Sequence, residues 1–287
     1  MSINLTWQKK AQAEFEPAFD VSALREPVKS PYLQVGRRIV PYLLPAATLL
    51  AWQIACRSGY VAPQILPSPT AVVLAAEHLA HTELWADVVI STKRALLGFV
   101  LGGSIGFAFG MFNGLIRAFE ELFDTTIHLT RTIPHLALIP LLILWFGIGE
   151  ETKVLLVAMG VFFPIYLNTF HGMRSVEPGL VEAGRVYGLR GFSLFRQVIL
   201  PAALPSILVG FRFALGAMWL TLIVAETIAA DSGIGYITTN AREFMQTDVM
   251  LVGILLYAFL GKGADLFSRT LERILLPWHP NYGKAAR

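Results

Sequence analysis

Residues 182–201 read Glu-Ala-Gly-Arg-Val-Tyr-Gly-Leu-Arg-Gly-Phe-Ser-Leu-Phe-Arg-Gln-Val-Ile-Leu-Pro, and they predict two short helical runs joined by a turn. Pro178 suits the first helical position, because the amide donor that proline lacks has no partner there in any case. Gly188 can adopt the left-handed conformation that ends a helix. The sequence therefore predicts a helix over residues 178–187, a turn, and a second helical run up to Pro201.

The surface predicted for this loop is both apolar and charged. Ala183 and Gly184 would leave a low spot beside the charged residues Glu182 and Arg185. Four further residues are too apolar for a freely solvated loop: Leu180, Tyr187, Phe192 and Phe195. A short helix of this kind is typical of a segment that docks into another protein.

The composition places the chain in a membrane. Of its 287 residues, 55% are hydrophobic and 15% are charged, whereas a soluble domain carries about 25% charged residues. This composition argues against a disordered chain and against an ordinary soluble enzyme. A disulfide-rich secreted fold is excluded as well, since Cys56 is the single cysteine. We predict an all-α integral membrane protein.

Six apolar stretches are candidates for membrane spans, since a helix needs about 20 mostly apolar residues to cross a bilayer. They are residues 40–55, 95–116, 133–148, 154–170, 202–228 and 249–260. The third follows an amphipathic run, 121–132, and contains Pro134 and Pro140, which predicts an interrupted helix. The sixth is short unless it extends through Lys262 and Asp265.

The basic residues predict the orientation, since lysine and arginine are enriched in cytoplasmic loops. With six spans, seventeen of them fall on the side of both termini and five on the other, so both termini are predicted to be cytoplasmic. The predicted organisation is a cytoplasmic N-terminal extension (1–38), a transmembrane domain (39–275) that includes the cytoplasmic loop 175–201, and a cytoplasmic tail (276–287).

The second span carries a glycine at every fourth position, which places the glycines on one helix face. They are Gly98, Gly102, Gly106, Gly110 and Gly114. In a membrane such a face lets another helix backbone approach closely. We predict packing within the chain, with a contact between subunits as the alternative.

The loop 182–201 resembles the "EAA" loop of ABC importer permeases, in which Glu-Ala-Ala, three residues, Gly, nine residues, Ile, one residue and Leu-Pro recur. The matching residues are Glu182, Ala183, Gly188, Leu200 and Pro201, with Gly184 in place of the second alanine and Val198 in place of the isoleucine. The resemblance implies the type I ABC importer permease fold and about six transmembrane helices. It also implies that these residues form a coupling helix in a groove of a separate ATPase subunit.

Three further segments resemble the nitrate/sulfonate/taurine branch of these permeases, and most of all the aliphatic sulfonate permeases. They are residues 131–147, 218–226 and 241–248, and the resemblance covers roughly residues 40–280. It implies ATP-driven import of aliphatic sulfonates across the bacterial inner membrane by alternating access. Taurine and nitrate remain alternative substrates.

The energy source is expected on another chain. The sequence contains no Gly-x-x-x-x-Gly-Lys-Ser/Thr phosphate loop, so we predict a transport subunit without enzymatic activity and without a cofactor. The implied partners are a pair of ATP-binding subunits, a second permease copy, a periplasmic binding protein and the lipid bilayer, but no nucleic acid. An ATPase-independent secondary transporter is the alternative of a different class; it would need intramembrane carboxylates or inverted repeats.

Several residues are candidates for the translocation path. An arginine within a span usually faces a cavity or the bundle interior, so Arg212 would pair with a sulfonate or, alternatively, with a structural partner. The other candidates are Asn168, Trp219, Thr221, Pro134 and His135, each equally suited to contacts between helices. Glu226 is predicted to act in gating or in contact with the binding protein, with a hydrated helix end as the alternative. No metal site is predicted.

Overall fold

The structure, a computed structural model, describes residues 31–279, and every regular element in that range is a helix. This confirms the predicted all-α class. The chain divides into two units, residues 1–55 and 56–287, and each is considered by itself. The first 30 residues of the predicted extension and residues 280–287 of the predicted tail lie outside the described range, so these two assignments stay predictions.

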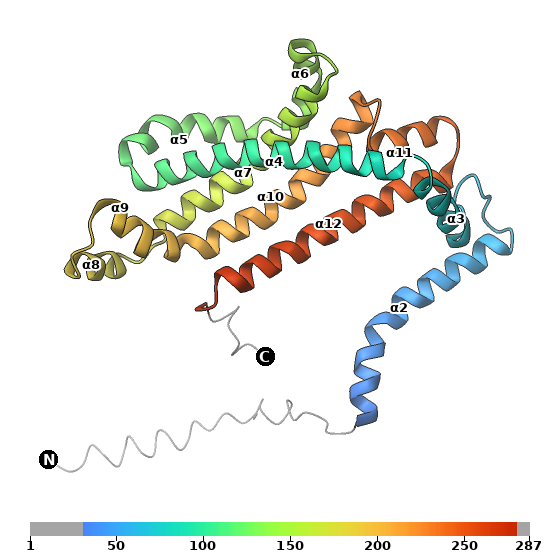
Figure 1. Cartoon of the computed structure of the whole chain (residues 1–287), viewed down its shortest axis with the longest axis horizontal. Helices are drawn as coiled ribbons and strands as arrows, with labels where there is room; N and C mark the ends of the chain where they lie inside the picture. Colours follow the sequence, from blue (N-terminus) through green and yellow to red (C-terminus); the bar gives the residue numbers. More distant parts are fainter. Residues whose placement is uncertain (1–30, 280–287) are drawn as a thin grey trace, which may run out of the picture. The chain divides into compact units, whose positions relative to one another are not determined.

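Helix α2 (Pro31–Arg57, blue in Figure 1) forms the described part of the first unit and contains the predicted first span. It has two internal prolines, Pro41 and Pro45. Its uninterrupted apolar stretch between Arg38 and Gln53 is shorter than the ~20 residues that a span needs.

Four helical segments of the described residues are long and apolar enough to cross a membrane. They are α4 (Leu84–Leu115), α7 (Glu150–Arg174), the run Gly191–Ile228 that contains α10 (Leu200–Ala229), and α12 (Thr247–Leu275). A fifth is added if α5 (Arg117–Thr132) and the helices over His135–Phe146 count as one bent span. The described residues thus give four or five spans rather than the predicted six, and α2 is not among them.

The predicted third span is not one helix. Helix α5 ends at Thr132, and a turn η2 (His135–Leu138) leads into the short helix α6 (Ile139–Phe146). The two parts meet at 81°. The cause is Pro134, because a residue that precedes proline is driven into extended backbone. Ile133 has that conformation, with φ −77° and ψ 119°.

Two predicted spans are longer in the structure. Helix α4 begins at Leu84 rather than at residue 95, and α12 continues to Leu275 rather than ending at residue 260. The polar side chains near the start of α4 do not interrupt the helix, because groups inside the protein form hydrogen bonds with them. In α12, Asp265 pairs along the helix with Lys262 and Arg269, at 3.4 and 3.0 Å.

The remaining helices of the second unit are short. They are α3 (Pro69–Ala80), α8 (Pro178–Val186), α9 (Gly191–Leu194), the π-turn η3 (Phe195–Ile199) and α11 (Ile234–Glu243). Helix α3 has an N-terminal cap, since the Ser68 hydroxyl accepts a hydrogen bond from the Ala71 amide. Helices α8 and α9 lie at one end of the long helices, and α11 lies at the other (Figure 1).

The glycine face of α4 lies against α7. A Cβ atom on Gly102 would lie 2.1 Å from the Ala158 carbonyl oxygen, and one on Gly106 would lie 2.6 Å from that of Phe162. At Gly98, Gly110 and Gly114 a Cβ would meet α7 atoms at 2.5–2.6 Å. The two backbones are therefore closer than any side chain on this face would allow. The structure places the stripe within the chain and not at a free surface.

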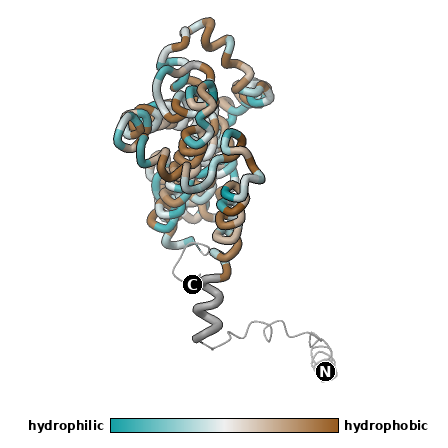
Figure 2. Tube along the Cα trace, turned by 90° about the vertical axis from the view of Figure 1, so that its right-hand side faces the viewer, coloured by the Kyte–Doolittle hydropathy of each residue, from teal (hydrophilic) through white to brown (hydrophobic). Residues whose placement is uncertain are grey.

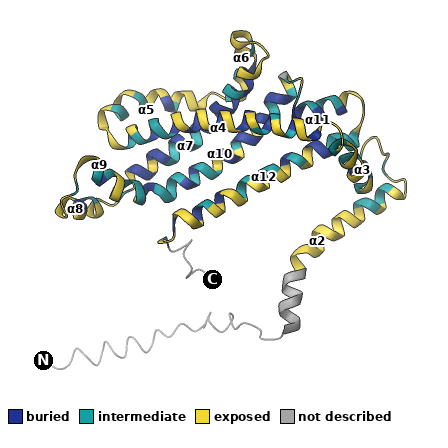
Figure 3. Cartoon of the chain, viewed as in Figure 1, coloured by how far each residue is buried: buried dark blue, intermediate teal, exposed yellow. Residues whose placement is uncertain are grey.

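The buried core follows from this contact. It consists of α7 residues such as Val157 and Val161, α10 residues such as Leu222, and Tyr257 of α12. Figure 3 shows buried residues along α7, which lies between α4 and α10.

Large apolar side chains also cover the outside of the long helices, as expected for lipid contact. Leu97, Val100, Phe213, Leu220 and Phe259 are all more than 60% exposed. Hydrophobic residues recur along the traced helices and not only between them (Figure 2). Apolar side chains are thus found both between the helices and on the outer surface. In this molecule, burial indicates contact with another helix rather than apolar character.

We predict that Gly106→Leu disrupts the α4–α7 contact. Over-packing a tight site costs about 1–3 kcal/mol, and here the obstacle is a backbone carbonyl that no rotamer change can move. The measurement is the amount of protein in the membrane and its melting temperature in detergent. Gly216→Leu is the control, because a Cβ at Gly216 meets nothing within 4 Å. Equal behaviour of the two variants would contradict the close packing.

Candidate functional site

The segment 175–201, called the coupling segment from here on, begins with a well-terminated helix. Helix α8 covers Pro178–Val186, and Gly188 has φ +83°. The Gly188 amide donates to the Arg185 carbonyl, and the Leu189 amide donates to the Gly184 carbonyl. These two bonds form a Schellman motif. The structure confirms the predicted helix and its glycine stop.

Gly184 was predicted to form part of a low spot on the surface, and this prediction is wrong. It is buried, and a Cβ there would lie 2.8 Å from Leu194 Cδ1 and 3.1 Å from Val198 Cγ2. The reason is that Gly184 forms the seat on which the second helical run packs. Gly184 thus fixes how α8 folds back on that run, whereas Glu182 and Ala183 remain exposed.

The second helical run does not end at Pro201. Helix α9 passes through the π-turn η3 directly into α10, whose first turn contains Pro201. A proline lacks the amide donor and its ring crowds the carbonyl four residues earlier, so a local wider turn relieves the clash. Leu200 and Pro201 are therefore the junction between the coupling segment and a membrane span.

The outward surface of the coupling segment is apolar and charged. Val186 and Tyr187 are each 86% exposed, and Phe192 is 73% exposed. Glu182, Ala183 and Arg185 are exposed on the same helix α8. This is the surface expected of a docking element, since solvated loops rarely hold several apolar side chains outward.

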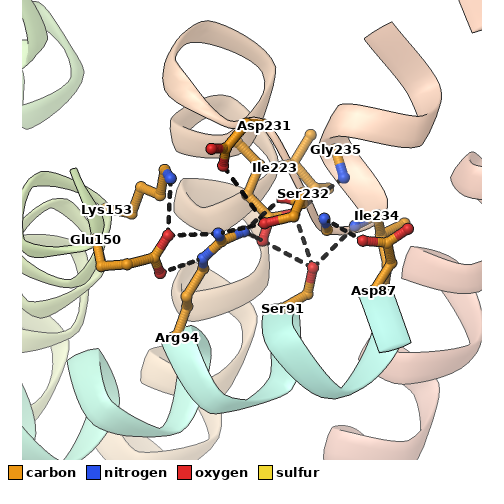
Figure 4. A network of polar contacts seen from close by, with 12 residues as sticks. Asp87, Ser91, Arg94, Glu150, Lys153, Ile223, Asp231, Ser232, Ile234 and Gly235 are labelled. Atoms are coloured by element: carbon orange, nitrogen blue, oxygen red, sulfur yellow. Dashed lines mark hydrogen bonds and ion pairs between the residues drawn. The ribbon is translucent and has the colours of Figure 1, made fainter. Parts of the chain in front are cut away.

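The opposite end of the long helices holds a buried polar network (Figure 4). It lies opposite the coupling segment because α7 runs from Glu150 to the start of that segment and α10 runs back toward Glu226. At its centre, the Glu226 side chain is fully buried and bonds to Arg94 Nη1 at 2.8 Å. The network joins α4, α7, α10, α11 and α12.

Glu226 accepts hydrogen bonds from donors on three other elements. They are the Ser91 hydroxyl (2.7 Å), the Tyr257 hydroxyl (2.9 Å) and the Gly235 amide (2.9 Å). A carboxylate with this many donors is satisfied in its buried position. Glu226 is therefore not the hydrated helix end left open by the sequence, and its burial does not suit direct contact with a binding protein. It ties the α10–α11 turn to α4.

Arg94 is the second centre of the network. Its Nε and Nη2 atoms each donate to one oxygen of Glu150 at 2.5 Å, and Nη1 also donates to the Ser232 carbonyl at 2.6 Å. Lys153 donates to Glu150 at 2.9 Å. Arg94 and Lys153 belong to the five basic residues predicted to lie on the side opposite the termini, and the structure places both inside helices, where they are buried.

The sequence was not recognised as placing Asp87, Ser91 and Arg94 in a functional site, although their spacing gives a signal. These positions continue the face of Gly98 and Gly102 toward the start of α4 at helical spacing. Asp87 accepts from the Gly233 amide at 2.6 Å, and Ser91 accepts from the Ile234 amide at 2.9 Å. The same α4 face thus changes from polar to glycine along its length.

Arg212 has a structural partner in this conformation. It forms an ion pair with Glu272 of α12, whose side chain is 1% exposed, while the Arg212 side chain is 34% exposed. The sequence left both a sulfonate and a structural partner open, and it did not identify Glu272. Three buried polar atoms here have no hydrogen-bond partner among the described residues: Arg212 Nε, Glu272 Oε1 and the Ser268 hydroxyl.

The other path candidates lie between helices. The Asn168 side chain donates to the Pro164 carbonyl at 2.8 Å, while the Asn168 carbonyl accepts from Ser206 of α10. Trp219 is buried in the core against Tyr257, and its Nε1 has no partner among the described side chains. Within the described part of the chain, neither of these two residues forms a hydrogen bond or a ring contact with Arg212.

Thr221 and His135 lie next to each other, whereas Pro134 is exposed. The Thr221 hydroxyl lies 3.4 Å from His135 Nε2. Both side chains are next to Gly160 of α7. This contact attaches the broken segment after α5 to α10. No group of three or more metal-ligating side chains occurs among the described residues.

Comparison with known proteins identifies the family. Residues 98–275, more than half of the chain, match the family described as "Binding-protein-dependent transport system inner membrane component". The chain belongs to this family. As a member it is a multi-pass membrane protein and a transport component, which confirms the family predicted from the sequence.

Two relatives are named as aliphatic sulfonates transport permeases, SsuC. The one from Escherichia coli K12 is 57% identical over 246 residues, which covers 85% of this chain and 94% of the relative. The one from Bacillus subtilis 168 is 44% identical over 241 residues, covering 84% and 87%. The taurine transport system permease protein TauC of E. coli K12 is 35% identical over 240 residues, covering 82% and 87%.

A solved structure shares the fold. An inward-facing form of the MetNI methionine ABC transporter matches with a TM-score of 0.52 and 21% identity, covering 67% of this chain and 93% of that one. The likeness confirms the predicted importer permease fold and, at this identity, concerns the fold alone.

We predict that Glu226→Gln destabilises the permease strongly. The substitution places an amide donor among four donors and removes the charge that faces Arg94, and breaking a buried ion pair typically costs about 3–5 kcal/mol. The measurement is the melting temperature of the purified protein. Asp231→Asn, at an exposed neighbouring carboxylate, should leave that temperature unchanged. Equal melting of both variants would show that the network does not hold the helices together.

A double-mutant cycle at Arg212 and Glu272 separates the two roles considered for Arg212. Arg212→Met should destabilise by about 3–5 kcal/mol, because it leaves Glu272 charged and buried without its partner. Combining it with Glu272→Leu should recover most of that loss. If the double variant also transports normally, Arg212 is structural. If it is stable but inactive, Arg212 belongs to the translocation path.

Proposed function

We propose that this chain is the permease subunit of an ABC importer for aliphatic sulfonates in the bacterial inner membrane. The observation that carries the proposal is the 57% identity to the E. coli SsuC protein over 94% of that protein's length. TauC, at 35%, supports taurine as a second candidate substrate. Nitrate has only the sequence resemblance in its favour.

In this proposal the coupling segment docks into a groove of a separate ATP-binding subunit. Support comes from its exposed Tyr187 and Phe192 and from the exposed Glu182 beside them. Two permease copies would pair with two ATPases and receive substrate from a periplasmic binding protein. ATP binding would close the ATPases and open the path outward, and hydrolysis would reset it. ATP would bind to the partner, with no cofactor on this chain.

A secondary transporter fits the buried charges less well. Such a protein needs a carboxylate that binds and releases an ion within the membrane. The two fully buried glutamates, Glu226 and Glu272, are each paired with an arginine. Their charge is therefore already neutralised inside the chain, which favours a transporter driven from outside.

The proposed orientation has both termini and the coupling segment in the cytoplasm, and it requires that α2 and the bent pair of α5 and α6 cross the membrane together with the four long helices. Support comes from the excess of lysine and arginine on that side. Arg94 and Lys153 belong to the few basic residues assigned to the opposite side, but both are buried and neither lies in a loop. The excess of loop lysines and arginines on the cytoplasmic side is therefore larger than the first count suggested.

The test is growth of a strain that lacks the gene on one sulfur source at a time. We expect growth on alkanesulfonates to be lost, to be restored by the gene, and not to be restored by Glu182→Lys, since a reversed charge at the docking surface should prevent coupling. Glu77→Lys, the same reversal at an exposed position of α3, is the control and should restore growth. Both variants should reach the membrane in equal amounts.

Other growth patterns would change the proposal. Loss of growth on taurine but not on alkanesulfonates would favour the second candidate substrate. Growth defects with nitrate as the nitrogen source would favour the third. Rescue by Glu182→Lys at normal rates would remove the coupling role from α8.

A further inference from the structure

At the end of the bundle opposite the coupling segment, two buried cations share one exposed carboxylate. The side chains of Arg94 and Lys153 are 3% and 2% exposed, whereas that of Glu150 is 58% exposed. The contacts are 2.5 Å from Arg94 and 2.9 Å from Lys153 to the same Glu150 oxygen. The exposed carboxylate of Glu150 thus lies between solvent and the two buried cations.

Among the described residues, Lys153 has a bonded anion only when Glu150 is in place. Glu226, with a fully buried side chain, neutralises one of the two cations from the inner side. Glu150 is the carboxylate bonded to Lys153 among the described residues, and it neutralises the other. If the Glu150 side chain turned into solvent, Lys153 would be left without a bonded anion in a desolvated place. Such a site favours an anion.

The donors are arranged for an oxyanion. Arg94 presents Nε and Nη2 side by side to the two oxygens of Glu150, the paired geometry in which arginine binds carboxylates and other planar or tetrahedral oxyanions. Lys153 adds a third donor from the next turn of α7. A sulfonate group has three oxygens and a single negative charge. It therefore matches the number of donors and supplies the anion that Lys153 would otherwise lack.

Glu150 is placed so that it can leave. It is the first residue of α7 and follows Gly147, which has φ +76°, and Gly149. A Cβ on either glycine would meet nothing within 4 Å. By contrast, Arg94 lies well inside α4, and the Lys153 side chain is held in a buried position, 2% exposed.

We propose that Arg94 and Lys153 form an anion site that binds the sulfonate group of the substrate when Glu150 swings outward. Glu150 occupies the site as a substitute anion in its absence. The substrate class rests on the proposed function. The phosphate of a lipid headgroup offers similar oxygens, so the test must separate the two sources.

The test measures binding of radiolabelled methanesulfonate to the full chain with its ATPase partner in nanodiscs of zwitterionic lipid. Glu150→Gln removes the competing charge but keeps the side-chain shape. We expect it to bind the probe at least about tenfold more tightly than the unmodified protein, a change equivalent to ~1.4 kcal/mol. Adding Lys153→Gln should cancel the gain. Neutral dimethyl sulfone should show no gain in any variant.

Glu151→Gln is the matched control, since Glu151 is the adjacent exposed carboxylate and forms no ion pair within the described part of the chain. Equal methanesulfonate affinity in Glu150→Gln and Glu151→Gln, each measured below its own melting temperature, would overturn the proposal. So would a Glu150→Gln protein that is stabilised by anionic lipid but does not gain affinity for methanesulfonate, because the site would then serve lipid.

The outcome is distinguishable from failure of the proposed function. If the growth test supports sulfonate import and Glu150→Gln leaves binding unchanged, the importer stands and this site is wrong. If growth does not depend on sulfonates but Glu150→Gln gains affinity that Lys153→Gln removes, the anion site stands and its substrate class must be revised.

Discussion

The close approach of α4 to α7 is the constraint on which the rest of the permease depends. In lipid there is little hydrophobic gain from helix association, so contact must come from packing and from polar bonds. Gly102 and Gly106 bring one backbone against the other, and the carbonyl oxygens of Ala158 and Phe162 leave no room for a side chain. With this pair fixed, α10 packs on the other side of α7 and completes the core.

The same α4 face makes the molecule different at its two ends. Where the glycines stop, Ser91 and Arg94 take over and bind Glu226 across the bundle. Charges at this depth are stable only because each has a partner of opposite sign. The end near the coupling segment has instead two long-range pairs, Arg174 with Glu120 and Arg212 with Glu272, and around the second pair several polar atoms have no hydrogen bond among the described residues. The buried polar groups of the network around Glu226 thus have hydrogen-bond partners, whereas several of those around Arg212 and Glu272 do not within the described residues.

The sequence predicted what depends on local chemistry and missed what depends on partners. Helix α8, its stop at Gly188 and the break at Pro134 follow from proline and glycine geometry, and the structure has all three. The start of α4 was misplaced because Arg94 reads as a loop charge until its two glutamates are known. Likewise, the burial of Gly184 depends on Leu194, a contact that one helix alone cannot reveal.

The π-turn η3 has a mechanical meaning. Through it, α9 and α10 form one helical run of 38 residues from Gly191 to Ile228, with no flexible linker between the docking surface and the membrane. At 1.5 Å per residue such a run is about 57 Å long. The chain is therefore helical from the exposed end of the coupling segment to Glu226, which lies in the network with Arg94. In the proposed importer, a partner that moved this segment would act through one continuous helical run on the charges at its far end.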